Sequence, residues 1–493
     1  MNVPSDPVAA HAFVAPERVA VIDGDVCTSY AALNAEVNRL ANGLRDLGLR
    51  AGERLVWCAP NSRQVLVTMH ACRKVGLVAI PLAYRLTASE MEFVVADSGA
   101  SILVADADQA PLLPTATHRI VFGGVHAGWT GWDALLAAAS GDEPPAPDQD
   151  ALGAAMMYTS GTTGRPKGAV RSRTDRALLG AMLAELRFPG GESEVHLTTG
   201  PLYHAGPNAF ALITHLTGGT VVVMRRFDAA EWVTLVQRHR VTSTFSTPTH
   251  MKRVVGLPGL DEADFSSLRS LIVNAAPVPY ALKEEIVARL GDGFLFEVYG
   301  SSELGIDTVL RPEDQLRKPG SCGRPYGGIE LKIVGDDGRE RPPGEEGDLY
   351  VRTALAIDGY RGDAQLAEIE GGWKSVGDIA YLDDEGYLYI CDRRDDLVIT
   401  GGMNVYPAEV EAVLHAHPDV QDAAVLGVPD DEWGQRVHAV VQAWPDREID
   451  VDALAAFAAS RLAGYKRPRS WEVRAELPRT ESGKLLKRLL RPG

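Results

Sequence analysis

Short apolar runs alternate with segments of helical spacing along the first three hundred residues. Helices are predicted from Ser29 to Gly48, over 62–75, over 88–97 and over 279–290, from the spacing of their apolar residues. Strands that alternate with helices in this way predict doubly wound sheets with parallel strands. The apolar runs that predict strands are 55–58, 78–81, 102–104, 151–157, 195–198, 220–224, 242–246, 271–273 and 294–299.

The pattern changes near residue 320, where glycine turns at 335–338 and 344–347 separate short strands and predict a small β-rich subdomain. Five consecutive charged residues, 392–396, are typical of a solvated turn. The roughly one hundred residues beyond them have their own βαββαβ-like pattern, enough for an independent domain. The predicted fold class is α/β: a large N-terminal domain of doubly wound mixed sheets plus a small β subdomain (1–394), then a small α+β C-terminal domain (395–493).

Composition narrows the functional classes. A formal charge of −17 over 493 residues argues against a nucleic-acid partner and against binding to an anionic membrane surface. No run of 18 apolar residues is present, and the N-terminal segment lacks the pattern of a secretory signal. The five cysteines are dispersed, which predicts reduced core residues and not disulfides or a zinc site. We therefore expect a cytoplasmic protein without integral membrane association.

The segment Tyr158–Gly168 is a candidate phosphate-binding loop. It contains three glycines, four serine or threonine hydroxyls and one lysine, Lys167. Unobstructed backbone N–H groups, short hydroxyl donors and one cation can surround the oxygens of a polyphosphate. The segment is not a Walker P-loop, because Pro166 stands where that motif requires glycine. A surface turn is the alternative that this segment alone leaves open.

Five motifs together resemble the adenylate-forming acyl-CoA synthetases, a family of acyl- and aryl-CoA ligases and luciferase relatives. They occur in the family's order and at its usual separations, and the resemblance covers essentially the whole chain. The five motifs are YTSGTTGRPKG (158–168), YGSSE (299–303), WKSVGD (373–378), DRRDDLVITGG (392–402) and PRTESGK (478–484).

The resemblance implies binding sites for ATP and Mg²⁺. Glu303 would ligate Mg²⁺, Ser302 would contact the α-phosphate and Tyr299 would stack on adenine, in the segment that includes Gly300. Asp378 would accept the ribose hydroxyls, and Arg393 would bridge ribose and phosphate. The remaining implied nucleotide contacts are Thr159, Ser160, Gly161, Thr162, Thr163, Gly164, Lys167, Ala275 and Ala276.

The resemblance also implies a two-step reaction. The acid and ATP would give an acyl-adenylate and pyrophosphate, and CoA would then give acyl-CoA and AMP. Lys484 would neutralise charge in the first step, and the mobile C-terminal domain would then rotate about a hinge at Asp395. The residues that match CoA-binding positions are Arg85, Gly401, Gly402, Trp433, Tyr465 and Arg467.

The acyl pocket is expected to be mostly apolar, without a fixed cation. That favours a hydrophobic monoacid, fatty or aryl or alicyclic, over a dicarboxylate. His204 is expected to position the substrate and not to act as a general base, because a carboxylate nucleophile is already ionised. The pocket residues implied by the resemblance are His204, Asn208, Phe210, Ile213, Phe245 and Asn274.

The chain departs from the family pattern in three places. Asp392 stands where glycine commonly precedes the motif arginine, Ser302 replaces threonine, and Asn274 replaces a frequent glycine. An adenylate-only ligase, a luciferase-like oxygenase and a catalytically silent nucleotide-binding scaffold remain alternatives. The sequence leaves the oligomeric state open, a homodimer included.

Overall fold

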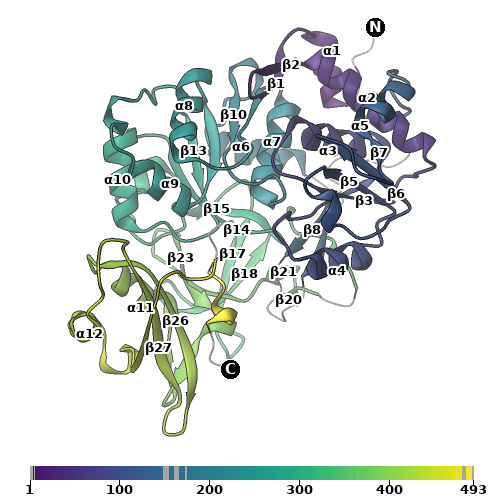
Figure 1. Cartoon of the computed structure of the whole chain (residues 1–493). Helices are drawn as coiled ribbons and strands as arrows, with labels where there is room; N and C mark the ends of the chain where they lie inside the picture. The colour runs from purple at the N-terminus through teal and green to yellow at the C-terminus, as the bar shows by residue number, and fades with distance from the viewer. Residues whose placement is uncertain are drawn as a thin grey trace.

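The computed structural model describes residues 4, 6–147, 155–159, 166–171, 175–362, 365–479 and 485–490, with only the backbone described for Thr159 and Arg488. A large body holds most of the chain, and the C-terminal strands extend from one end of it (Figure 1). No helix among these residues is both long and apolar enough to cross a membrane.

The largest sheet in the described ranges has parallel central strands and antiparallel edges. Parallel pairing, for example Thr244 with Leu271, places successive strand ends along one edge. Across the sheet the strands are β16 (Arg324–Pro325), β15 (Gly305–Leu310), β14 (Leu295–Ser301), β13 (Ser270–Val273), β12 (Ser243–Ser246), β10 (Val195–Thr198), β11 (Thr220–Val223), β1 (Val19–Asp23) and β2 (Val26–Ser29).

A second sheet also has parallel central strands, and the candidate phosphate loop joins an antiparallel pair at one side of it. Across this sheet the strands are β19 (Gly359–Tyr360), β9 (Lys167–Arg171), β8 (Ala155–Thr159), β4 (Val78–Pro81), β3 (Arg54–Cys58), β5 (Ile102–Asp106), β6 (His118–Phe122) and β7 (Thr130–Gly131).

Helices pack on these two sheets and begin where the sequence supplies capping residues. Ser29 accepts a hydrogen bond from Ala32 N–H, and Ser62 accepts one from Val65 N–H, so each caps the helix that follows it. The helices are α1 (Pro7–Val14), α2 (Tyr30–Asp46), α3 (Arg63–Val75), α4 (Ala88–Ser98), α5 (Trp132–Ala138), α6 (Arg176–Glu185), α7 (Ala205–Thr217), α8 (Ala229–His239), α9 (Pro248–Val255) and α10 (Tyr280–Leu290).

The predicted β-rich subdomain is a third sheet of antiparallel strands. Its strands are β17 (Glu330–Val334), β18 (Gly347–Arg352), β20 (Ala367–Ile369), β21 (Trp373–Ser375), β22 (Asp378–Leu382) and β23 (Leu388–Arg393).

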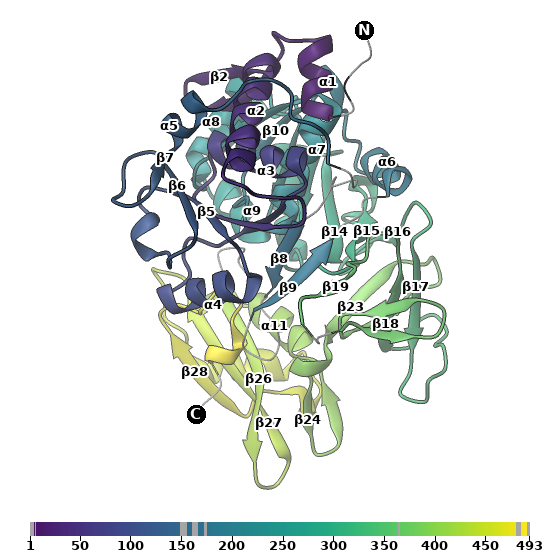
Figure 2. The ribbon, with the colours of Figure 1, turned by 90° about the vertical axis from the view of Figure 1, so that its right-hand side faces the viewer.

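The C-terminal lobe, defined here as residues 395–493, has its own sheet and core. Its strands gather at the end of the molecule opposite α1 and α2 (Figure 2). A core of Val398, Val410, Val425 and Leu454 joins the sheet to the two helices. The elements are β24 (Val398–Thr400), β25 (Met403–Val405), α11 (Pro407–His415), β26 (Val420–Asp430), β27 (Gly434–Ala443), α12 (Val451–Ala459) and β28 (Ser470–Arg474).

Short 3₁₀ turns complete the described secondary structure. One of them, η5, follows β23 at the start of the C-terminal lobe. The turns are η1 (Ala110–Leu112), η2 (Gly191–Ser193), η3 (Leu260–Glu262), η4 (Pro312–Asp314), η5 (Arg394–Asp396), η6 (Gly464–Lys466) and η7 (Lys487–Leu489).

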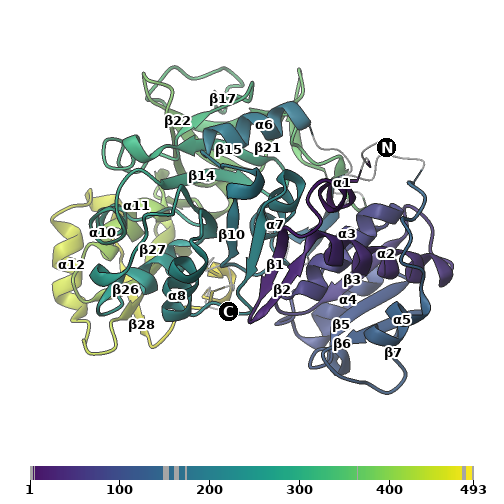
Figure 3. The same cartoon turned by 90° about the horizontal axis from the view of Figure 1, so that it is seen from above.

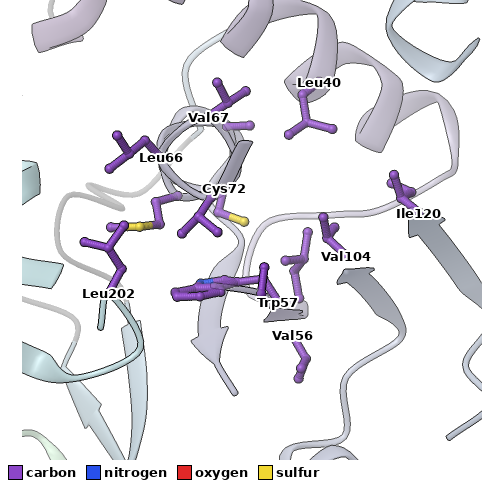
Figure 4. Packing of buried hydrophobic residues seen from close by; sticks show 14 of the residues in the cluster. Leu40, Val56, Trp57, Leu66, Val67, Cys72, Val104, Ile120 and Leu202 are labelled. Atoms are coloured by element: carbon purple, nitrogen blue, oxygen red, sulfur yellow. The ribbon is translucent and has the colours of Figure 1, made fainter. Parts of the chain in front are cut away.

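The main core fills the space between the second sheet and its helices. Trp57 lies among Leu66, Cys72 and Leu202, and each of these side chains is at most 1% exposed (Figure 4). Seen from above, α2 and α3 lie with β3, β5 and β6 on one side, and α8 and α10 lie on the other (Figure 3). The large body is therefore built from two doubly wound halves, which confirms the predicted α/β class.

The charge run 392–396 is solvated only in part: Arg394 and Asp395 are exposed, whereas β23 continues through Arg393 and leaves Asp392 only 8% exposed. One local expectation was wrong. Cys27 is exposed on β2 and is not a core residue, whereas Cys58 and Cys72 are buried as expected.

A buried ion pair fixes α10 against β14. Lys283 Nζ lies 2.5 Å from Glu297 Oε2, and the two side chains are 1% and 6% exposed. Glu297 Oε1 also accepts a hydrogen bond of 3.1 Å from Val278 N–H. Burial raises the pKa of Glu297, and Lys283 counteracts that rise. If either side chain is removed, the remaining charge is left unpaired in the interior.

We predict that Lys283→Met lowers the free energy of unfolding by about 3–5 kcal/mol, because it leaves the Glu297 carboxylate buried without a cation. Urea denaturation at pH 7 measures this change. The matched control is the double variant Lys283→Met/Glu297→Gln, in which both charges are absent. It should recover most of the loss, and a double variant as unstable as the single one would contradict the explanation.

Candidate active site

A cleft of about 4060 Å³ runs between the two sheets of the large body, the β subdomain and the C-terminal lobe. The ends of β12, β13 and β14 open into it, as do the first turn of α7 and the strands β22 and β23. Ligand sites of open α/β sheets lie at such strand ends.

At one end of the cleft, Asp378 is held between two other predicted site residues. Tyr299 Oη donates a short hydrogen bond to Asp378 Oδ2, and Arg393 Nε lies 3.3 Å from Asp378 Oδ1. Asp378 is 5% exposed, and it pairs directly with Arg393 across β22 and β23. Burial raises the pKa of Tyr299, and the Asp378 carboxylate raises it further. The phenol therefore remains a hydrogen-bond donor at neutral pH.

Glu303 and Lys167 meet through an aromatic side chain. Tyr360 Oη donates to Glu303 Oε1 at 2.9 Å, and Lys167 Nζ lies 5.6 Å from the centroid of the Tyr360 ring. The lysine of the phosphate-loop strand β9 is thus placed near the carboxylate that follows β14. A cation and a carboxylate at this spacing suit a phosphate and its metal ion.

Glu303 is the residue that the motif resemblance assigns to Mg²⁺. Among the described residues, no group of three or more His, Cys, Asp or Glu side chains could hold a metal ion by itself. Mg²⁺ commonly takes only one or two protein carboxylates and completes its shell with water and phosphate oxygens. Glu303 fits that mode, in which Mg²⁺ neutralises phosphate charge.

His204 is a neutral side chain that lines the cleft. It precedes α7, and burial lowers its pKa to about 4. Its Nε2 atom is buried without a hydrogen-bond partner. A neutral imidazole with one unsatisfied nitrogen can donate to or accept from a bound molecule, as a positioning residue requires.

The segment 274–277 between β13 and α10 is strained. Ala275 has φ 77°, a left-handed conformation that is uncommon outside glycine, and its N–H donates to Asn274 Oδ1. Ala275 and Ala276 both line the cleft. Strain of this kind concentrates at binding sites, where the backbone is held for contact.

An aromatic wall closes the apolar end of the cleft. The Phe210 and Phe245 rings stack with centroids 5.5 Å apart, at 1% and 7% exposure. A Cβ at Gly206 would lie 2.4 Å from Phe245 Cζ, so only glycine leaves room for the tip of the ring here. Ile213 extends the same wall, whereas the Asn208 amide donates to Leu202 O at 2.9 Å, within the protein.

The C-terminal lobe presents its tail to the cleft. Leu485, Leu486 and Lys487 line it. On another side of the same lobe, Lys252 Nζ of α9 lies 4.3 Å from the Trp444 ring centroid and bonds Gln421 O at 3.5 Å. The lobe therefore touches the large body both at its tail and at β26 and β27.

The predicted CoA residues do not all come together at the cleft. Arg85 lines the cleft, but the C-terminal ones do not. A Cβ at Gly401, whose φ is +55°, would lie 2.6 Å from Trp433 Cε3, and Arg469 stacks on the same indole at 4.2 Å. The predicted CoA residues outside the cleft lining are Gly401, Gly402, Trp433, Tyr465 and Arg467.

Most other predicted site residues do line this cleft. They are Lys167, His204, Asn208, Phe210, Ile213, Phe245, Asn274, Ala275, Ala276, Tyr299, Gly300, Ser302, Glu303, Asp378, Arg393 and Asp395. The predicted residues Ser160, Gly161, Thr162, Thr163, Gly164 and Lys484 lie outside the described residues, as does the side chain of Thr159.

Sequence reasoning missed two residues that organise the site. Tyr360 is one, because nothing in the spacing of Gly359-Tyr360 links it to Glu303. Arg171 is the other: it donates to Ser302 O at 3.1 Å and to Leu355 O. Its position directly after the glycine loop was the available signal, but a basic residue there also fits a solvated turn.

Comparisons with known proteins agree with this geometry. The family model described as "AMP-binding enzyme" matches residues 8–361, and that described as "AMP-binding enzyme C-terminal domain" matches residues 409–484. A feruloyl-CoA synthase of Amycolatopsis sp is 38% identical over 96% of this chain and 95% of its own length. A long-chain-fatty-acid–CoA ligase of Mycobacterium tuberculosis is 34% identical over 97% of this chain and 96% of its own.

A solved structure is similar to this chain over its whole length. The o-succinylbenzoate CoA synthetase of Bacillus subtilis, in complex with its acyl-adenylate intermediate, has a TM-score of 0.86 and 30% identity. The match covers 100% of this chain and 99% of that one. Another structure of that enzyme contains ATP and a magnesium ion. The predicted family, ligase class and ATP, Mg²⁺ and CoA requirement agree with these relatives. From its motifs, its fold and its full-length similarity, the chain belongs to the AMP-binding enzyme family.

Proposed function

We propose that the chain activates a hydrophobic carboxylic acid with ATP and transfers the acyl group to CoA. The observation that carries this proposal is a single cleft with a nucleotide end, built around Asp378 and Glu303, and an apolar end closed by Phe210 and Phe245. An acid placed between these ends has its carboxylate beside the α-phosphate of ATP.

At the nucleotide end, separate residues contact the ribose, the adenine and the phosphates. Asp378 accepts the ribose hydroxyls while Arg393 holds that carboxylate and reaches phosphate. Tyr299 lies against adenine, and Ser302 donates to the α-phosphate. Arg171 positions Ser302 by donating a hydrogen bond to the carbonyl oxygen of Ser302. The amides and hydroxyls of 159–164, with Lys167, hold the outer phosphates.

Acid activation requires no proton transfer from the carboxylate. The carboxylate oxygen attacks the α-phosphorus, pyrophosphate leaves, and charge accumulates on the phosphate oxygens. His204 stays neutral, so it orients the substrate without repelling the cationic groups around the phosphates. Lys484 directly precedes the cleft-lining residue Leu485 and supplies a cation as charge develops in the transition state.

The apolar end favours an aryl acid. The Phe245 ring approaches Gly206 with its tip and stacks on Phe210, which gives a planar substrate an aromatic surface. A related feruloyl-CoA synthase acts on an acid of this type, as its name says. Leu179, Leu183 and Ile213 also line the cleft, so a fatty acid is the second candidate.

The second half-reaction requires the C-terminal lobe to move. Arg85 lines the cleft while Trp433 and Gly401 lie outside its lining, so we infer that another arrangement of the lobe brings them to one CoA. We place the domain boundary at 394/395, with rotation about Asp395, which is exposed. Rotation brings the Gly401–Trp433 side to the cleft and withdraws the tail. We propose a cytoplasmic location, because the proposed reaction consumes ATP and CoA.

An acid panel tests the proposed reaction. We predict that substituted cinnamic and benzoic acids release pyrophosphate faster than fatty acids, and that multiple-turnover AMP formation requires both acid and CoA. Pyrophosphate release and chromatographic detection of AMP and thioester measure this, with malonate as the dicarboxylate control. Acid-dependent hydroxamate formation with hydroxylamine but no CoA thioester would show an adenylate-only ligase. No acid-dependent pyrophosphate with any acid would indicate a nucleotide-binding scaffold.

We predict that the Asp378 carboxylate contributes to the binding of ATP and AMP. Asp378→Asn removes the charge that faces the ribose and Arg393, so the Kd for ATP and AMP should rise about 10–100-fold. Isothermal titration calorimetry measures both. Glu330→Gln, an exposed change in the same sheet, is the matched control and should bind as wild type. An unchanged AMP affinity in Asp378→Asn would show that the ribose lies elsewhere.

We predict that Trp433 contributes to the binding of CoA and not to the binding of ATP. Trp433→Ala should raise the KM for CoA about 10-fold, in line with the ~1–3 kcal/mol that base stacking on an aromatic side chain contributes. Steady-state kinetics with CoA varied, together with acid-dependent ATP–pyrophosphate exchange, measures this. Val473→Ala, an exposed apolar change in the same lobe, is the control. If only the KM for ATP moved, Trp433 would have been assigned to the wrong ligand.

A further inference from the structure

We propose that His196, held by Ser243 and Glu194, sets the depth of the apolar end of the cleft and thereby the length of the acid that is accepted. The inference rests on the proposed function and names a residue that determines its specificity. The three side chains are called here the backing network, because they lie behind the aromatic wall of the cleft.

The first observation is the place of the backing network in the largest sheet. His196 on β10 lies directly beside Ser243 on the neighbouring strand β12. Phe245 follows Ser243 by two residues on β12, so both side chains lie on the same face of the sheet. Phe245 lines the cleft, whereas His196 and Ser243 are 0% exposed and do not line it. The network therefore lies one layer behind the wall.

The second observation is a chain of two hydrogen bonds that fixes the His196 ring. Ser243 Oγ donates a short hydrogen bond to Glu194 Oε1, and His196 Nδ1 lies 2.8 Å from Ser243 Oγ. Because the Ser243 proton is directed to Glu194, Nδ1 carries a proton and donates to Ser243. Burial lowers the pKa of His196 to about 3, so the imidazole is neutral at pH 7. The ring cannot rotate without breaking the bond to Ser243.

The third observation is that this neutral ring packs against the wall from behind. The His196 ring stacks on Phe210, with centroids 6.1 Å apart and planes 23° apart. Phe210 stacks in turn on Phe245, with planes 29° apart. The Phe188 ring lies 6.0 Å from Phe210 and 6.3 Å from His196 and fills the same space. In a close-packed interior, Phe210 has no room to move back while these two rings stay in place.

The polar groups of the network give the wall an orientation that apolar packing alone would not give. A buried carboxylate, hydroxyl and imidazole lose hydration, and burial raises the pKa of Glu194 to about 7. Their hydrogen bonds offset part of this cost and hold the imidazole in one plane. Because the planes of His196, Phe210 and Phe245 are nearly parallel, the fixed plane of His196 is passed on to the surface that faces the substrate.

The size of residue 196 then decides how deep the apolar end can become. A smaller side chain leaves a void behind Phe210, and surrounding groups relax partly into such a void. Each methylene that a hydrophobic pocket accepts or rejects changes kcat/KM about 10–200-fold. His196 does not line the cleft and acts through Phe210, so it is a positioning residue.

The test compares para-methyl and para-butyl cinnamic acids. Turnover is measured as acid-dependent pyrophosphate release, and binding by isothermal titration calorimetry with the matching acyl sulfamoyladenosines, which are stable analogues of an acyl-adenylate. His196→Asn shortens the side chain and keeps an amide that can donate to Ser243. Ser243→Ala keeps the ring and removes its fixed partner. Val236→Ala, a buried change on α8 outside the cleft lining, is the matched control for lost stability.

We expect the wild type to favour the para-methyl acid. In His196→Asn, the ratio of kcat/KM for the para-butyl acid to that for the para-methyl acid should rise about 10-fold. The ratio of the two analogue affinities should shift in the same direction, and the KM for ATP should not change. Ser243→Ala should shift both ratios less, and the double variant should shift them no further than His196→Asn, because the ring that Ser243 holds is then absent. Val236→Ala should keep the wild-type ratios.

Phe188→Leu opens the same space from another side and provides a second variant if His196→Asn does not fold. It should also shift both ratios toward the para-butyl acid. Unchanged ratios in the folded variants would show that the network does not set the depth. Equal losses for both acids with a fall in Tm, as in Val236→Ala, would show that it only stabilises the fold. A wild-type protein that binds the analogues but releases no pyrophosphate with any acid would refute the proposed reaction, and the binding ratios would still decide the inference.

Discussion

The arrangement of the site depends on the carboxylate of Asp378. It accepts from Tyr299, which extends from the largest sheet, and pairs with Arg393 on the neighbouring strand of the β subdomain. Two separate sheets are thereby joined at one buried charge. Because β23 ends at Arg393 and η5 follows directly, the same interaction fixes the chain at the point where we propose that the hinge begins.

In the proposed function, one cleft serves two reactions. The large body would hold the nucleotide and the acid at the strand ends that line the cleft. The tail of the C-terminal lobe lines the cleft, and the turns that contain Gly401 and Trp433 lie outside this lining. A rotation of the lobe would exchange these two surfaces. The Asp392–Ala408 hydrogen bond and the Lys252–Trp444 contact hold the lobe in the arrangement described.

Local sequence signals were sufficient for most of the fold. Ser29 and Ser62 cap the helices that begin at these positions, as predicted. The apolar runs form buried strands, because short uninterrupted apolar segments are typical of strands that are covered on both faces. Motif order placed Tyr299, Glu303 and Asp378 in one cleft correctly, although nearly eighty residues separate the first from the last. The charge run by itself did not predict the burial of Asp392, because polarity predicts exposure only where the fold offers no partner, and here Ala408 N–H donates to Asp392.

By itself, the sequence determined most of the elements, their order and the family, and its motifs named the residues that we propose contact ATP. These follow from local periodicity and from motif residues whose chemistry suits phosphate, ribose and metal. Only the tertiary structure decided which distant groups meet: Tyr360 with Glu303, Phe245 with Gly206, and Asp392 with Ala408. Such contacts depend on how separate layers pack, and packing is set by the sum of many weak interactions that no short stretch of sequence contains.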